Sequence, residues 1–171
     1  IATSAFTNEV EDKTLPYLLL KPISRLNIIL SKLLATLVIA APVVVMSGLA
    51  AMLVAGGLMK PIVALAFGLL AGVIGYSTIF TWLGLVTNQA LGFALVYVFM
   101  WEGILSTFLD SIRYLSIRGY TLAIIHGLDR NGYEEFQSRV IEYPAAVVGT
   151  IAVSIVFVTL ANWRLRSMDV M

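Results

Sequence analysis

Charged residues divide this chain into long apolar runs. Between Lys32 and Lys60 lie 27 uncharged residues, and between Lys60 and Glu102 lie 41. A bilayer core of about 30 Å takes roughly 20 helical residues, so the first run predicts one tilted span. The second run would make about 60 Å of helix, twice the core thickness, so it must turn once. A further apolar run covers Tyr143 to Trp163.

The polar cluster Thr87-Asn88-Gln89 lies inside the longer run, and we place the turn there. The pattern then predicts four spans, near residues 33–58, 61–86, 90–109 and 145–163. Each should be helical, because a helix satisfies its own backbone hydrogen bonds in lipid, and strand-type alternation is absent. The predicted fold class is an all-α membrane protein, a polytopic helix bundle, with residues 1–171 forming a single transmembrane domain.

Composition agrees with a lipid environment. Apolar residues make up 60% of the chain and charged residues 12%, against roughly 45–50% and about 25% in soluble domains. There is no Cys, which excludes disulfides and thiolate metal sites. The net charge of +1 argues against a nucleic-acid partner, which would need a basic stripe.

The positive charges indicate an orientation. With four spans both chain ends lie on one side, which then carries six of the 11 Lys and Arg residues. Charges near span ends carry the most weight, and Lys32 and Arg164 adjoin predicted spans. We therefore expect cytoplasmic chain ends. Residues 110–144 would form an external linker with short interfacial helices, because they mix aromatic, aliphatic and basic residues.

One long stretch, residues 8–32, mixes charges, prolines and leucines. Leu15, Leu18 and Leu19 fall on one face at helical spacing. Pro22 disfavours helix at Lys21, and Ser24 can cap the helix that follows. By periodicity alone, the segment fits equally a docking surface for a partner protein or an interfacial helix lying on the membrane.

The order of residues in this segment resembles the cytoplasmic signature of ABC-2-type permeases, the membrane subunits of ABC exporters. In that family Glu-x-Glu precedes Thr-Leu, then Leu-Leu, then Lys/Arg-Pro-Ile/Val-Ser-Arg and a Lys that opens a span. The matching residues are Glu9, Glu11, Thr14, Leu15, Leu18, Leu19, Lys21, Pro22, Ile23, Ser24, Arg25 and Lys32. Lys13 departs from the pattern, since a Gly is common there.

The resemblance implies a coupling segment that docks on a separate ABC ATPase subunit, which would hold the ATP and Mg. The residues implied in coupling are Glu9, Glu11, Thr14, Leu15, Leu18, Leu19, Lys21, Pro22 and Arg25. A second permease subunit, identical or different, would complete the transporter. We expect a multi-pass protein of a prokaryotic cell (plasma) membrane. Because the family usually has six spans and Ile1–Thr7 looks like the end of one, we expect two more upstream.

No bond-making chemistry is indicated. The stretch from Glu134 to Arg139 fits the Glu-Glu-x-x-x-Arg pattern of intramembrane metalloproteases, but a catalytic metal takes several ligands and His126 is the single His. No Gly-x-x-x-x-Gly-Lys-Ser/Thr loop is present, so that route to ATP is closed. We expect no catalytic residue, metal or cofactor in this chain. The alternative function is a non-ABC scaffold or channel that uses residues 8–32 as an anchor.

Three features lie inside predicted spans. Pro42 should kink its helix, either as a hinge or as a static bend. Ala64, Gly68 and Gly72 repeat every four residues, which suits close helix packing within the subunit or at a dimer interface. Glu102 is costly within a span. It either contacts the translocation pathway or its gate, or reaches water from the span end.

Overall fold

The computed structural model describes residues 1–12, 24–54, 59–105, 115–129 and 141–167 of the chain. Every regular element in these ranges is a helix, which agrees with the predicted all-α class. The elements are α1 (Ser4–Glu11), α3 (Arg25–Val54), α4 (Met59–Val86), α5 (Ala90–Val96), the π-helical η1 (Tyr97–Leu105), α7 (Ile117–Leu128) and α8 (Tyr143–Ser167).

Three of the described helices are long and apolar enough to cross a membrane. They cover Arg25–Val54, Ile62–Val86 and Tyr143–Ser167, close to three of the predicted spans. The apolar stretch Ala90–Ile104 is shorter. It overlaps the remaining predicted span, near residues 90–109, whose last residues lie outside the described ranges. By length and composition the described helices therefore account for a multi-pass protein with three full spans and one shorter apolar helix.

The turn between α4 and α5 lies where the polar cluster predicted it. Helix α4 ends at Val86 and α5 begins at Ala90. The Gln89 backbone N–H donates to the Thr87 hydroxyl oxygen at 3.2 Å, which stabilises the turn. Short polar side chains of this kind bond their own backbone two residues on, so they favour turns over continued helix.

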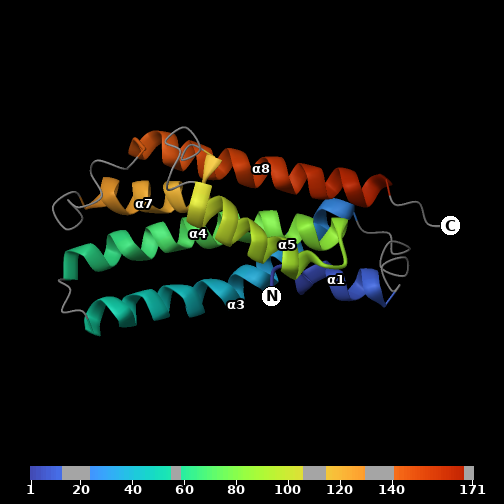
Figure 1. Cartoon of the computed structure of the whole chain (residues 1–171), viewed down its shortest axis with the longest axis horizontal. Coiled ribbons are helices and arrows are strands. Elements are labelled where there is room, and N and C mark those ends of the chain that lie inside the picture. Colours follow the sequence, from blue (N-terminus) through green and yellow to red (C-terminus); the bar gives the residue numbers. More distant parts are fainter. Residues whose placement is uncertain (13–23, 55–58, 106–114, 130–140, 168–171) are drawn as a thin grey trace.

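Helix α4 lies at the centre of the bundle. It packs against α3, α7 and α8, and also against α1. Figure 1 shows α3, α4 and α8 running lengthwise, with α7 lying between α4 and α8 toward one end. The C-terminal end of α8 lies at the opposite end, on the same side as α1 and the start of α3.

Helix α7 and the α5–η1 segment follow one another along α4. The rings of Phe80 on α4 and Tyr97 on η1 meet edge-on at 6.5 Å. Nearer the start of α4, Gly75 faces Ile117 and Gly68 faces Ile125. In these contacts the residue numbers fall along α4 while they rise along η1 and α7. Both segments therefore run antiparallel to α4 (Figure 1).

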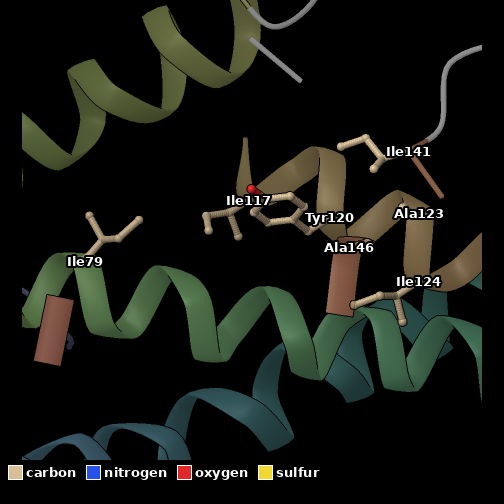
Figure 2. Close-up of a cluster of buried hydrophobic side chains, with 7 residues drawn as sticks. All are labelled: Ile79, Ile117, Tyr120, Ala123, Ile124, Ile141 and Ala146. Carbon is tan, nitrogen blue, oxygen red and sulfur yellow. The ribbon is translucent and has the colours of Figure 1, made fainter. Parts of the chain in front are cut away.

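Two buried apolar clusters hold these helices together. One joins α1, α3, α4 and α8, and its members are Phe6, Ile28, Ile29, Leu85, Ala161 and Leu165. The other centres on α7 and is drawn in Figure 2; its members are Ile79, Ile117, Tyr120, Ala123, Ile124, Ile141 and Ala146. Large apolar side chains elsewhere on α3 and α8 are exposed, as expected of helices that face lipid.

The predicted linker, residues 110–144, contains α7. This helix packs along α4 with its inner face buried. The side of the membrane on which the linker lies stays a prediction. Pro42 lies inside the continuous helix α3, and its action as a hinge or as a static bend also stays a prediction.

Candidate functional site

The carboxylate of Glu102 binds the N-terminus of α7. Glu102 comes from η1, and its side chain is 2% exposed. It accepts hydrogen bonds from the backbone N–H groups of Ile117 at 2.9 Å and Arg118 at 3.3 Å. The Tyr97 hydroxyl donates to it at 3.1 Å, and the Ser116 hydroxyl donates a further short bond. These hydrogen bonds connect the buried carboxylate on η1 to the start of α7.

Helix physics explains this arrangement. The first N–H groups of a helix have no intrahelical acceptor, and the helix dipole favours an anion there. Ser116 is the N-cap residue of α7, and its hydroxyl oxygen accepts from the Gly119 N–H at 3.0 Å. The Arg118 guanidinium donates to the backbone carbonyl of Glu102 at 3.4 Å. The two elements are therefore joined through the backbone as well as through the carboxylate.

The outcome for Glu102 differs from one of the two alternatives drawn from the sequence. Its carboxylate is buried at a helix terminus and does not extend into water from the end of a span. Contact with a translocation pathway or gate stays a prediction. The signal missed in the sequence is Ser116, a good N-cap residue placed directly before the apolar helix that begins at Ile117.

Aromatic side chains connect this carboxylate to a groove in the bundle. Tyr76 of α4 lies close enough to Glu102 to interact with its carboxylate. The Tyr76 ring stacks on the Phe80 ring, with 5.7 Å between their centres. Tyr76 and Phe80 also line a mainly apolar groove of about 460 Å³ bordered by α3, α4 and α7. Thr36 and Thr121 add hydroxyl groups to its wall.

The small residues of α4 lie against α7, inside the subunit. A Cβ added at Gly72 would lie 2.6 Å from the Thr121 hydroxyl oxygen, and one at Gly68 would meet the side chain of Ile125. Ala64 is 2% exposed on the same helix. Because Gly68 and Gly72 have no Cβ, two helices can approach closely there. Gly68 and Gly72 thus face a neighbouring helix of the same chain.

The coupling residues are described only in part. Glu9 and Glu11 lie in α1, and Arg25 is the first residue of α3. The predicted contacts Thr14, Leu15, Leu18, Leu19, Lys21 and Pro22 lie outside the described residues. As predicted, Ser24 caps α3, because its hydroxyl oxygen accepts from the Asn27 N–H at 3.2 Å.

Two cations at the beginning of α3 bind other helices. The Arg25 guanidinium donates to the Leu165 carbonyl of α8 at 2.6 Å. The Lys32 ammonium donates a short hydrogen bond to the Ala5 carbonyl and lies 4.5 Å from the centre of the Phe6 ring. The start of α3 is thereby attached to both α1 and α8.

A metal centre finds no support in the described part of the chain. Among the residues that the structure describes, no three His, Cys, Asp or Glu side chains lie close enough to hold a metal ion. That the chain carries no catalytic residue and no cofactor of its own stays a prediction.

Comparison with known protein families shows which family this chain belongs to. Residues 1–125 match the model of a family described as ABC-2 family transporter protein. Comparisons with curated proteins and with solved structures gave no significant match. The matched residues cover α1, the segment with the Glu-x-Glu and Pro-Ile-Ser-Arg motifs, and most of the bundle, so they confirm the resemblance seen in the sequence. This multi-pass membrane chain belongs to the ABC-2 family of ABC transporter proteins.

Proposed function

We propose that this chain is the permease subunit of an ATP-driven exporter and couples ATP hydrolysis by a separate ATPase subunit to movement of a substrate. The observation that carries the proposal is the family match over residues 1–125, which contains the charged segment and two membrane-length helices. A non-ABC scaffold or channel, the alternative function, is not favoured by any comparison. The chain would lie in a prokaryotic plasma membrane, paired with a second permease subunit.

In this proposal residues 8–32 dock on the ATPase. The segment runs from the end of α1 into the beginning of α3, and the two helices share the buried cluster around Phe6 and Ile29. A push on the segment would therefore act on packed helices at both of its ends. The apolar face of Leu15, Leu18 and Leu19 supplies the docking surface, because it lies on an otherwise charged stretch.

The proposal includes four crossings and cytoplasmic chain ends. The α5–η1 segment covers 16 residues, about 24 Å of α-helix, which falls short of a core of about 30 Å. Helix α7 continues the same course along α4. We treat the two as one interrupted crossing, and with α3, α4 and α8 this makes four.

At the interruption Glu102 joins η1 to the start of α7. Interrupted helices place exposed helix termini within the membrane, and polar groups must satisfy them there. In our proposal Glu102 contributes to a gate by holding the two halves in register, so that release of its hydrogen bonds frees α7 from η1.

Affinity purification tests the function. The tagged chain would be expressed in its native membrane, extracted in mild detergent and purified. Mass spectrometry should find an ABC ATPase in stoichiometric amount, and the complex should hydrolyse ATP. An equally hydrophobic tagged membrane protein from the same cells serves as the control. If the intact, monodisperse chain brings down no ATPase, even after cross-linking in whole cells, the proposed function is wrong.

A further inference from the structure

The last turn of α8 receives a cation from the beginning of α3. Helix α8 ends at Ser167, and the final carbonyl groups of a helix have no intrahelical donor. One of them belongs to Leu165, which accepts a hydrogen bond of 2.6 Å from the Arg25 guanidinium. The two residues are 140 positions apart in sequence. The contact therefore joins distant parts of the chain and does not arise from local helix geometry.

Charge and burial both favour this contact. A guanidinium stays protonated at any physiological pH, and the negative end of the helix dipole attracts it. The Arg25 bond is partly buried, and the Leu165 side chain is 0% exposed. Ile28 and Ile29, one turn beyond Arg25, pack in the same cluster as Leu165. The hydrogen bond is thus held by apolar packing directly beside it.

Arg25 has a distinctive place in the chain. It is the first residue of α3 and follows the N-cap Ser24. The proposed coupling segment, residues 8–32, continues through Arg25 into the beginning of α3. A displacement of the part of the segment before α3 reaches Arg25 before it reaches the rest of α3, and the Leu165 contact passes it to α8 as well.

We propose that Arg25 is a positioning residue that fastens the coupling segment, at the point where α3 begins, to the C-terminal end of α8, so that one movement of the segment displaces α3 and α8 together. This inference rests on the proposed function for its role in transport. It assigns to Arg25 a contact within the permease, where the resemblance implied a contact with the ATPase. The test must separate these two uses of the same guanidinium.

The first experiment measures the attachment itself and needs no ATPase. The chain has no Cys, so Asn27→Cys and Ser167→Cys, both at exposed positions, carry the only spin labels. Dipolar EPR on the full chain in lipid nanodiscs should give a narrow distance distribution. Arg25→Gln should broaden it toward longer distances, and Arg25→Lys should restore part of the narrow component because the positive charge remains.

The matched control is Arg166→Gln, which removes the same charge from an exposed side chain in the same last turn of α8. Its distance distribution should equal that of the unchanged chain. A distribution for Arg25→Gln that also equals it overturns the proposal. Size-exclusion profiles identify variants that fail to fold. If Arg25→Gln fails to fold, the distance distribution of Arg25→Lys is compared with that of the unchanged chain, and an identical distribution overturns the proposal.

The second experiment uses the permease–ATPase complex. Arg25→Gln should still bind the ATPase with unchanged affinity, but substrate transported per ATP should fall roughly tenfold, as expected for losing one charge-assisted hydrogen bond. Loss of ATPase binding with an unchanged EPR distribution would mean that Arg25 contacts the ATPase directly, which also overturns the proposal. If no ATPase binds the unchanged chain, the proposed function fails, while the EPR result still decides the attachment to α8.

Discussion

Thr121 of α7 lies against Gly72 of α4 so closely that a Cβ on residue 72 would be 2.6 Å from the Thr121 hydroxyl oxygen. Thr121 cannot easily turn away. Its hydroxyl donates to the Ile117 carbonyl at 3.0 Å, and β-branched side chains are restricted at χ1 in helices. The contact therefore sets how near the two helices lie.

Gly72→Ala should destabilise the bundle by about 1–3 kcal/mol, the usual cost of overpacking. Gly92→Ala is the matched control, since a Cβ there meets nothing within 4 Å, and Ala is the better helix former. Thermal unfolding followed by fluorescence-detected size exclusion should show a lower midpoint for the first variant and an equal or higher one for the second. Equal midpoints for both variants would mean that α7 does not pack this tightly on α4.

Glu102→Gln should weaken the joint between η1 and α7. The glutamine amide keeps one acceptor oxygen, but its NH2 group replaces the other oxygen. That NH2 group would face the donor groups of Ser116 and the α7 N-terminus. One unmatched buried polar group costs about 1–3 kcal/mol. We expect assembly to persist while transport falls.

Glu142→Gln, at an exposed position, controls for the change of charge. Thermal midpoint and transport rate should be measured on both variants in the same preparation. Transport by Glu102→Gln at the unchanged rate would show that this carboxylate has no part in a gate.

Leu18→Asp should leave membrane insertion intact and abolish the stimulation of ATP hydrolysis, because it puts a charge into the proposed docking face. Tyr17→Asp introduces the same charge on the opposite side of a helix with this spacing. ATP hydrolysis by each reconstituted complex is the measurement. The docking face is misplaced if Leu18→Asp couples normally, or if Tyr17→Asp is just as damaging.

Both chain ends should be cytoplasmic, and the part of the linker that follows α7 should lie outside. Single cysteines can report this directly, because the chain has none of its own. A Cys at Ser138 should react with an impermeant thiol reagent added to whole cells, whereas one at Ser167 should react only after the membrane is opened. The reverse pattern would invert the orientation.

The spans could be predicted from the sequence because lipid imposes a simple rule on it. A charge within the apolar core is costly, so the charged residues mark the outer parts of the helices. Lys60 is the second residue of α4, Lys32 lies seven residues after the start of α3, and Glu102 lies three residues before the end of η1. The turn at Thr87 followed from the same rule, since polar side chains within an apolar run are placed most easily where the helix ends.

The contacts of Glu102 and the burial of α7 could not be predicted in this way. An amphipathic helix such as Ile117–Leu128 has the same pattern whether its apolar face lies in the membrane interface or against glycines of another helix. The spacing of Gly68 and Gly72 predicted a close neighbour but did not identify it. The partners of Arg25 and Glu102 depend on tertiary contacts across 140 and 15 positions, which no local pattern encodes.

The glycines of α4 also limit how α7 can move. Ile117, Thr121 and Ile125 project into notches at Gly75, Gly72 and Gly68, and these side chains recur every four residues along α7. A small slide of α7 along α4 would move each of these side chains away from its glycine and against the larger residues between the glycines. A slide of one helical turn, about 5.4 Å, would place Ile117 at Gly72 and Thr121 at Gly68. This packing therefore favours a displacement of α7 by a whole helical turn over a continuous slide along α4.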